Sequence, residues 1–338
     1  MNEIKCVLIT GGAGYVGAVL TPKLLAADYQ VKVLDLYIYD AHVLDAVKDN
    51  PNLEQVKGDI RDTALLQKII PGCDAVIHLA CISNDPSFEL NPELSKSINY
   101  DAFEPLVRIS NECGVNRFIY ASTCSVYGLS DAEHVTEDHP LVPLTDYNKY
   151  KGLCEPILFS YQSPDFTTVT IRPATVCGYS PRQRMDLTVN ILTNHAFNKN
   201  AITVFGGSQT RPNLHIEDMT DLYLLLLKLP DEKIAGKIYN AGYQNKSVAE
   251  IANIVQSVMA QEYPERERPD INTVPSDDIR SYRISSDKIY RELNFNPKHT
   301  IEDAVRDLIN AFREGKLPNS MEDNCYFNIR KMQEIDLK

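Results

Sequence analysis

Tyr147 and Lys151 are the residues of this sequence best suited to moving a proton. Tyr147 is the only one of the 18 tyrosines with lysine four positions later, a spacing that puts both side chains on one face of a helix. Free tyrosine has a pKa of about 10, so it is a poor base at neutral pH unless cations favour its phenolate. We predict that Tyr147 is a general base assisted by Lys151; the alternative is a surface helix with an incidental pair.

A glycine-rich run near the start of the chain predicts a phosphate-binding turn. Its spacing is Gly-x-x-Gly-x-x-Gly, and it lies between an apolar stretch and a predicted helix. Such glycines permit a tight turn, close approach of the backbone to a pyrophosphate, and close packing of helix on strand. A plain loop is the alternative. The residues predicted to bind a dinucleotide here are Gly11, Gly14, Tyr15, Val16 and Gly17.

Acidic residues at two predicted strand ends indicate which dinucleotide is bound. Asp35 follows Gly17 by 18 residues, where a carboxylate can accept hydrogen bonds from ribose hydroxyls. No arginine or lysine follows it to hold a 2′-phosphate, so NAD is favoured over NADP. Asp59 and Ile60 are expected to receive the adenine, and Asp62 to cap the next helix. With NAD present, Tyr147 would take a proton from a substrate hydroxyl as hydride leaves.

Composition excludes several classes of protein. The chain has 338 residues, which favours two domains, and its net charge of -12 argues against a nucleic-acid partner. Its eight cysteines include no Cys-x-x-Cys pair, so we expect reduced thiols in a cytoplasmic protein and no metal site. The N-terminus lacks the features of a signal peptide. The longest apolar run, Leu222 to Leu227, is too short to cross a membrane.

Short apolar runs alternate with amphipathic segments over residues 1–172. This alternation predicts an α/β fold, a Rossmann-type doubly wound parallel sheet that binds NAD. Residues 173–315 are predicted to form a smaller substrate-binding region, from which the chain returns to the sheet near 214–241. No element is predicted in the tail, 316–338. The strands expected are 5–10, 30–36, 53–57, 75–79, 117–121, 167–172, 202–205 and 237–241, and the helices are 16–27, 63–70, 100–113, 147–161, 187–197 and 214–229.

A small polar run, Thr123 to Ser125, follows a predicted strand at the end where such sheets bind ligands. Together with the preceding features it carries a resemblance. Over residues 4 to about 310 the chain resembles the extended short-chain dehydrogenase/reductase family of NAD-dependent nucleotide-sugar epimerases and dehydratases. The motifs that carry it are Thr10 to Gly17, Asp59-Ile60, His78 to Ala80, Ser122 to Gly128, Tyr147 to Lys151, Arg172-Pro173 and Leu214 to Asp218.

The resemblance implies further site residues. Thr123 matches the family's catalytic Ser/Thr, which works with Tyr147 on the oxygen at C4 of the sugar. Leu79, Ala80 and Pro173 are implied as cofactor contacts. A homodimer packing the helices near 100–113 and 147–161 is implied as well. The residues expected to bind the nucleotide-diphosphate sugar are Ser83, Asn84, Cys124, Ser125, Thr175, Arg182, Arg184, Asn190, Arg211 and Arg280; Ser83 and Asn84 could equally be loop residues that cap a helix.

Cys124 and Ser125 depart from the dehydratase branch of the family, which has Asp and Glu at these positions. Since serine cannot replace a carboxylate base, dehydration is disfavoured. Cys124 could serve as an acid or base, or fill space in the core. We therefore expect an epimerase that oxidises C4 to a 4-keto intermediate. A 4-dehydrogenase that releases the ketone is one alternative, because residues 180–190 resemble a branch that includes GDP-mannoheptose 4-dehydrogenases; a silent NAD-binding regulatory protein is another.

Overall fold

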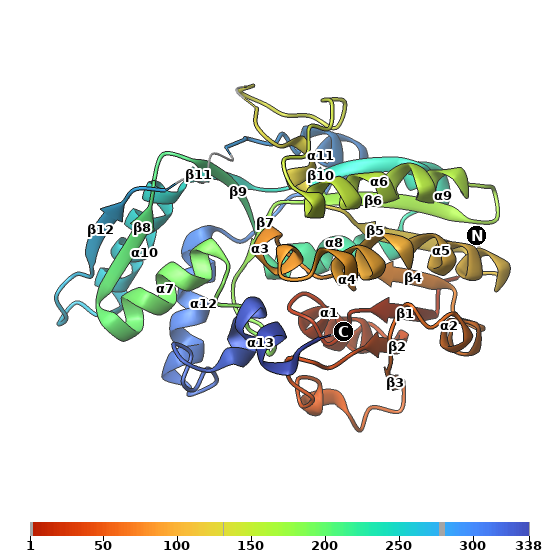
Figure 1. Ribbon diagram of the computed structural model, residues 1–338, viewed down its shortest axis with the longest axis horizontal. Helices are drawn as coiled ribbons and strands as arrows, with labels where there is room; N and C mark the ends of the chain where they lie inside the picture. Colours follow the sequence, from red (N-terminus) through yellow and green to blue (C-terminus); the bar gives the residue numbers. More distant parts are fainter. Residues whose placement is uncertain (1–2, 131, 277–280, 338) are drawn as a thin grey trace.

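The computed structural model describes residues 3–130, 132–276 and 281–337. Its main unit is a seven-stranded sheet with strand order β10-β6-β5-β4-β1-β2-β3 (Figure 1), and every neighbouring pair is parallel. This order confirms the predicted Rossmann-type fold. The strands are β1 (Cys6–Thr10), β2 (Gln30–Asp35), β3 (Leu53–Lys57), β4 (Ala75–His78), β5 (Arg117–Ala121), β6 (Thr167–Pro173) and β10 (Lys237–Ala241).

Helices cover both faces of this sheet. Strands β1 and β4 are buried along their whole length, as expected where helices pack on both sides of parallel strands. One face is covered by α1 (Gly17–Ala26), α8 (Ile216–Lys228) and α11 (Asp287–Leu293). The opposite face is covered by α2 (Thr63–Ile69), α5 (Phe103–Glu112) and α6 (Asp146–Ser160). Three short helices complete the unit: α3 (Asp85–Glu89), α4 (Pro92–Lys96) and α9 (Asp231–Ile234).

Two predicted helices begin later than expected. The helix predicted from Leu214 begins as α8 at Ile216, because Leu214 and His215 belong to strand β9 (Thr210–His215). Pairing with a neighbouring strand outweighs the helical period at these two residues. The helix predicted from Tyr100 begins as α5 at Phe103, and a π-helical turn, Ser97–Asp101, precedes it.

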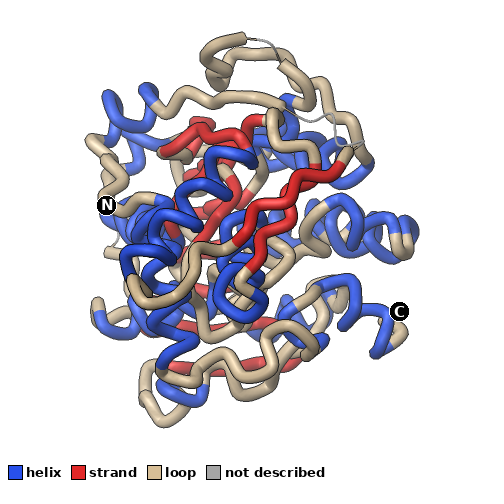
Figure 2. The backbone as a smooth tube through the Cα atoms, turned by 90° about the vertical axis from the view of Figure 1, so that its left-hand side faces the viewer, coloured by secondary structure: helices blue, strands red, loops and turns tan. Residues whose placement is uncertain are grey.

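A smaller unit lies beside the carboxyl ends of the strands, at the left of Figure 1, and faces the viewer in Figure 2. It contains a three-stranded sheet, in which β9 lies between β7 (Thr175–Cys177) and β11 (Gln244–Ser247). Strands β8 (Ala201–Phe205) and β12 (Asp270–Val274) form a second, parallel pair. Helices α7 (Thr188–Lys199), α10 (Val248–Glu262) and α12 (Ile301–Arg313) enclose its apolar core.

The tail folds back onto the rest of the molecule. It contains a short turn, η4 (Asn324–Tyr326), and helix α13 (Asn328–Ile335), neither of which was predicted. Tyr326 packs in a buried cluster with Met185 and Leu308, and its carbonyl accepts a hydrogen bond from the Met185 backbone at 2.9 Å. Helix α13 thereby lies between α12 and the main unit, next to α3 (Figure 1).

The described residues contain neither a membrane-spanning helix nor a metal-binding cluster. None of the described helices has both the length and the apolar character that crossing a bilayer requires. Within the same residues no group of histidine, cysteine and acidic side chains is arranged to hold a metal ion. The eight cysteines are free thiols, and the buried sulfurs of Cys6 and Cys73 lie 3.8 Å apart.

Candidate active site

A cavity of about 450 Å³ opens at the carboxyl ends of the parallel strands, where the strand order reverses between β1 and β4. Both units contribute to its walls. Most of the residues predicted for cofactor, catalysis and substrate lie together there: Gly11, Gly14, Tyr15, Val16, Gly17, Asp35, Asp59, Ile60, Leu79, Ala80, Ser83, Asn84, Thr123, Cys124, Ser125, Tyr147, Lys151, Pro173, Thr175, Arg182, Arg184 and Arg211.

Two of the predicted substrate residues are not among these cavity residues. Arg280 lies outside the described residues. Asn190 is fully buried and is not part of the cavity wall. Its Oδ1 accepts a hydrogen bond from the Gly178 backbone at 3.1 Å, and its Nδ2 donates to the Tyr15 hydroxyl at 3.1 Å and the Arg184 carbonyl at 2.9 Å. Asn190 therefore holds Tyr15 and the backbone of Gly178 and Arg184 together, from a position outside the cavity.

The glycine turn joins β1 to α1 with no room for side chains at two positions. Gly11 has φ +77°, and a Cβ there would lie 2.6 Å from the Ala80 nitrogen. A Cβ on Gly17 would lie 2.5 Å from the Gly11 carbonyl oxygen. The bare backbone of the turn thus forms a cradle that a side chain would fill, as a pyrophosphate-binding turn requires.

Asp35 ends β2 beside this turn. Its Oδ2 accepts a hydrogen bond from the Ala13 backbone at 2.9 Å, and its Oδ1 accepts one from the Tyr37 backbone at 2.8 Å. Burial raises the pKa of this carboxyl, while the two backbone donors act in the opposite direction. Each oxygen retains a second lone pair, which suits the two hydroxyls of a ribose.

Replacing Asp35 should weaken the binding of NADH. We expect the Asp35→Asn variant to lose about tenfold or more in affinity, because a hydrogen bond to a charged group contributes ~1.5–3 kcal/mol. A titration of NADH fluorescence measures this directly, since the chain contains no tryptophan. Asp40→Asn is the matched control, because Asp40 is exposed in the same loop and lies outside the cavity wall. Equal affinities in the two variants would contradict the ribose role.

Asp59 and Asp62 lie after β3 and have separate tasks. The Asp59 carboxylate pairs with Arg61, with 2.6 Å between Oδ2 and Nη2. Burial opposes ionisation of Asp59, but its hydrogen bonds from Arg61 lower its pKa overall. Asp62 accepts a hydrogen bond from the Leu65 backbone at 3.0 Å, which confirms the predicted cap of α2.

The predicted catalytic hydroxyl sits on the loop after β5. Thr123 Oγ1 lies 2.8 Å from Ser125 Oγ and accepts a hydrogen bond from the Ser125 backbone at 3.2 Å. The Ser125 hydroxyl in turn donates to Oδ1 of Asn148, in the first turn of α6. Thr145 caps that helix, so Tyr147 stands in its first turn and faces the cavity.

Lys151 and Tyr147 differ in their surroundings. The buried Lys151 ammonium donates a hydrogen bond to the Ala121 carbonyl at 2.7 Å and lies 5.0 Å from the centre of the Tyr120 ring. Burial raises the pKa of Tyr147 well above its usual value, and the charges of Cys81 and Asp85 act in the same direction. Without ligands Tyr147 is therefore a neutral phenol at neutral pH, and its ionisation needs additional positive charge.

A buried ionic network supports the catalytic loop. Glu155, one helical turn after Lys151, pairs with Arg172 of β6 at 2.6 Å, and the two side chains are 4% and 3% exposed. Glu155 also accepts a hydrogen bond from Ser122 at 2.7 Å, and Arg172 donates one to the Tyr127 hydroxyl at 2.7 Å. The network joins α6, which carries Tyr147 and Lys151, to the ends of β5 and β6. The loop that carries Thr123 follows β5.

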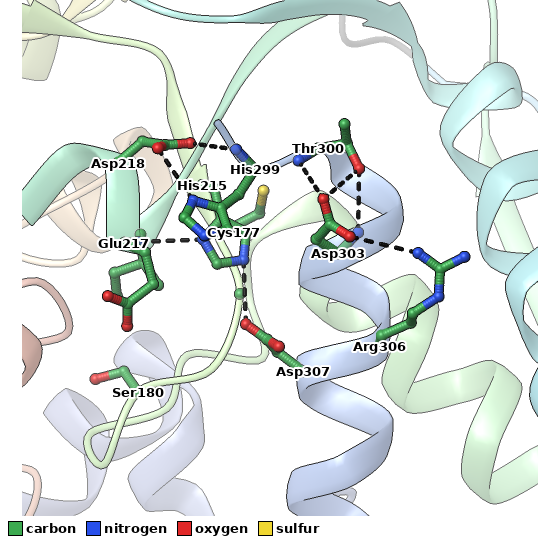
Figure 3. Close-up of polar contacts among 12 residues, drawn as sticks. Cys177, Ser180, His215, Glu217, Asp218, His299, Thr300, Asp303, Arg306 and Asp307 are labelled. Carbon is green, nitrogen blue, oxygen red and sulfur yellow. Dashed lines mark hydrogen bonds and ion pairs between the residues drawn. The ribbon is translucent and has the colours of Figure 1, made fainter. Parts of the chain in front are cut away.

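A second polar cluster fixes β9, the strand that carries Arg211 (Figure 3). The rings of His215 and His299 stack with 4.9 Å between their centres. His215 Nε2 lies 3.2 Å from an Asp307 oxygen, and His299 Nδ1 lies 3.0 Å from an Asp218 oxygen. These four residues are not part of the cavity wall. They hold the end of β9 against α12, and Arg211 lies four residues earlier on the same strand.

Asn84, which was predicted for the site, lines the cavity and also caps α3.

Four residues of the cavity wall were given no role in advance. The Tyr282 hydroxyl lies 3.7 Å from the sulfur of Cys124. Tyr39, Asp186 and Asn328 also line the cavity, and Asn328 comes from the tail. Asp186 lies in the 180–190 stretch, in which only the arginines and Asn190 were predicted to bind substrate. No motif marked Tyr39 or Asn328, because each reaches the site through contacts between segments distant in sequence.

Comparison with known proteins finds one matching family model, the NAD-dependent epimerase/dehydratase family, over residues 7–242. A low-salt glycan biosynthesis protein, Agl12, of Haloferax volcanii is 30% identical over 253 residues, covering 73% of this chain and 79% of the relative. UDP-glucose 4-epimerase 2 of Arabidopsis thaliana is 29% identical, covering 90% and 94%. A human dTDP-D-glucose 4,6-dehydratase is 28% identical, covering 92% and 90%.

Solved structures show the same fold. A dTDP-glucose 4,6-dehydratase from Streptomyces venezuelae, with NAD bound, superposes with a TM-score of 0.82 at 24% identity, covering 95% of this chain and 99% of that one. A UDP-glucuronic acid 4-epimerase from Bacillus cereus, in complex with UDP-glucuronic acid and NAD, gives a TM-score of 0.80 at 24% identity, covering 91% and 99%.

Proposed function

Because the chain belongs to the NAD-dependent epimerase/dehydratase family, we propose that it epimerises a nucleoside-diphosphate sugar at C4. Bound NAD supplies the hydride acceptor and donor for the sugar carbon. The observation that carries the proposal is the shared cavity, in which Thr123, Tyr147 and Lys151 line the same space as the glycine turn and Asp35. Proton transfer and hydride transfer can therefore occur at one carbon.

Each catalytic side chain has a distinct task in this reaction. Tyr147 removes the proton of the C4 hydroxyl as the C4–H hydride leaves, and returns a proton to that oxygen after the ketone has been reduced from its other face. The hydroxyl of Thr123 hydrogen-bonds the same oxygen. Lys151 places a buried positive charge near the loop that carries Thr123, and this charge favours the developing anion.

The positions after Thr123 favour epimerisation over dehydration. The Ser125 hydroxyl donates its hydrogen bond to Asn148. Serine also lacks a carboxylate that could take up a proton. Cys124 is 2% exposed, and burial raises the pKa of its thiol to about 12. It is a neutral thiol at neutral pH. Elimination of water across C5 and C6 would thus lack the acidic pair that the dehydratase branch has at these two positions.

Removing the thiol should leave the chemistry largely intact. We expect the Cys124→Ala variant to keep its kcat within about tenfold of wild type, since a neutral, buried thiol transfers no proton in the proposed reaction and tenfold corresponds to ~1.4 kcal/mol. Steady-state rates on the active nucleotide sugar measure this, with circular dichroism to check folding. A loss of about a thousandfold in a folded variant would instead make Cys124 an acid or base.

The substrate diphosphate needs cations on the catalytic side of the cavity. Arg211 projects from β9, and its charge lowers the pKa of Cys124, although burial has the larger and opposite effect. It therefore lies close to the catalytic loop. Arginine binds diphosphate through paired, directed donors, so Arg211 is the main anchor that we assign to the nucleotide sugar. Thr175 lies on the adjoining strand, β7, and lines the same wall.

Product analysis separates the proposed reaction from its rivals. The NAD-loaded protein is incubated in turn with UDP-glucose, UDP-glucuronic acid and dTDP-glucose, each deuterated at C4, and the products are analysed by NMR. We expect one of these sugars to give a mixture of C4 epimers that keeps the deuterium, without net formation of NADH. Stoichiometric NADH with release of a 4-keto sugar would establish the dehydrogenase. No turnover of any sugar would favour a silent NAD-binding protein.

We also propose a homodimer that packs α5 and α6 against their mates. Leu153 on α6 is 41% exposed, and Leu141, Val142 and Leu144 of the preceding loop are exposed as well. Apolar side chains gathered on one helix and its approach favour burial against a partner. Light scattering should give a mass near twice the 38.1 kDa of one chain; a mass near that of one chain would contradict the proposal.

A further inference from the structure

Asn328, the first residue of α13, joins the tail to the cavity. It is 1% exposed, and each of its polar groups has a partner on another segment. Its Oδ1 accepts a hydrogen bond from Arg182 Nη2 at 2.5 Å, and its Nδ2 donates one to Ser83 Oγ at 3.0 Å. Its backbone N–H donates to Asp186 Oδ2 at 3.2 Å. The tail thus fixes the orientation of an arginine that lines the cavity.

Arg182 is a buried cation that forms no ion pair with the described residues. It is 3% exposed, and its Nε and Nη1 have no hydrogen-bond partner among the described residues. The nearby Asp186 is paired with Arg184, at 2.9 Å from its Nε. Burial lowers the pKa of Arg182 to about 10, so it is still charged at neutral pH. Such a charge costs several kcal/mol unless an anion accompanies it.

The surroundings of Arg182 indicate which anion it meets. Its guanidinium lies 3.7 Å from the centre of the Tyr39 ring, in the loop that follows Asp35. Its charge lowers the pKa of Asp35 and of Tyr15, against the larger effect of burial on both groups. Arg182 therefore stands near both the glycine turn and the ribose-binding carboxylate. In Rossmann folds the dinucleotide's own diphosphate lies at the glycine turn, next to the ribose that this carboxylate binds.

We infer that Arg182 binds the diphosphate of NAD, and that Asn328 of the tail is the residue that positions it. This changes the expectation from sequence, which grouped Arg182 with the substrate residues. Arg211 and Arg182 then serve two different diphosphates: one beside Cys124 and the catalytic loop, the other beside Asp35. The inference depends on NAD as the cofactor and not on the proposed epimerisation. A different reaction would therefore leave the role of Arg182 unchanged, and a different role of Arg182 would leave the proposed reaction unchanged.

Equilibrium binding tests the inference without any turnover. NADH is titrated by its fluorescence into wild type, Arg182→Gln, Asn328→Ala and the double variant. We expect losses of affinity of roughly 10- to 150-fold for Arg182→Gln, since a hydrogen bond to a charged group contributes ~1.5–3 kcal/mol, and of about 3- to 10-fold for Asn328→Ala. Because Asn328 acts through Arg182, its substitution should add less than about twofold in the Arg182→Gln background.

Calorimetric titrations with UDP and dTDP show which diphosphate Arg182 binds. The affinity for UDP and for dTDP should change less than about twofold in Arg182→Gln. Weaker UDP or dTDP binding with unchanged NADH binding would assign Arg182 to the sugar nucleotide and overturn the inference. Full additivity of the two substitutions would overturn the positioning role of Asn328.

Control variants separate binding from folding. Asn324→Ala alters the same tail, but the Asn324 side chain donates to Glu334 at 3.2 Å on the exposed side of α13, so this variant should leave NADH affinity unchanged. Arg182→Lys keeps the charge and loses the directed donors, so it should bind NADH more tightly than Arg182→Gln. If Arg182→Gln does not fold, the NADH affinity of Arg182→Lys is compared with that of wild type in its place. Equal NADH affinities in these two variants and in wild type would exclude any contact with the cofactor.

Discussion

The Tyr147→Phe variant should lose about 10²- to 10⁴-fold in kcat, the contribution typical of a positioned general acid–base group. The substitution removes one oxygen and keeps the ring, so the edge-on contact of this ring with Phe88, 6.4 Å between centres, remains. NADH affinity and thermal stability should therefore change little. Rates are measured on whichever of UDP-glucose, UDP-glucuronic acid or dTDP-glucose turns over in wild type.

Tyr150→Phe is the matched control for this experiment. Tyr150 lies three residues further along α6, its ring packs between Phe88 and Tyr100, and it does not line the cavity. Removing the Tyr150 hydroxyl should leave kcat unchanged. If both variants were equally active, Tyr147 would not be the base.

The pH dependence of the reaction should belong to Tyr147. Burial raises the pKa of this residue, so the phenol is protonated at neutral pH and the basic form grows as the pH rises. We expect kcat/KM of wild type to rise steadily across the whole range from about pH 6 to about pH 9, without a plateau, and the residual activity of Tyr147→Phe to lose that rise. A rise of the same steepness in the variant would assign the titration to another group.

The Glu155→Ala variant should be destabilised by about 3–5 kcal/mol, since it leaves Arg172 as a buried charge without its partner. Ser122 loses its hydrogen-bond acceptor at the same time. Urea unfolding followed by circular dichroism measures the change. The double variant Glu155→Ala/Arg172→Ala should lose less than the sum of its single variants, because the second substitution removes the unpaired charge.

An exposed ion pair provides the control for this stability effect. Lys246 and Glu250 are 3.2 Å apart, away from α5 and α6, and their side chains are 35% and 52% exposed. Solvent screens such a pair, so Lys246→Ala should cost at most about 1 kcal/mol. Similar losses for Glu155→Ala and Lys246→Ala would show that the buried network contributes little to stability.

The parts of the site that sequence predicts well depend on local geometry. Gly11, Gly17 and Asp35 belong to one strand–turn–helix–strand unit, in which spacing alone determines position. Tyr147 and Lys151 share one helix, so their spacing also determines their relative position. Strands β1 and β4 could be predicted as well, because buried parallel strands are nearly continuous apolar runs.

The parts that sequence did not predict depend on contacts across the fold. Asn328 reaches Ser83 over 245 residues, and no local pattern encodes such a meeting. Leu214 was assigned to a helix because its pairing with Val176 of β7 is invisible in the sequence. The arginines at 182 and 211 could both be predicted to bind an anion from the sequence. Their separate positions in one cavity depend on the fold and could not be predicted.

The pairing of β10 with β6 has a consequence for how the chain folds. Strand β6 ends at Pro173 and β10 begins at Lys237, and the segment between them forms β7, α7, β8, β9, α8 and α9. Closing so long a loop carries a large entropic cost before any contact is formed, so we expect β10 to dock late. Until then, the backbone donors and acceptors along the outer edge of β6 are unpaired and open to other chains. Refolding should therefore lose yield to aggregation as protein concentration rises, and the edge of β6 is the surface through which that association would begin.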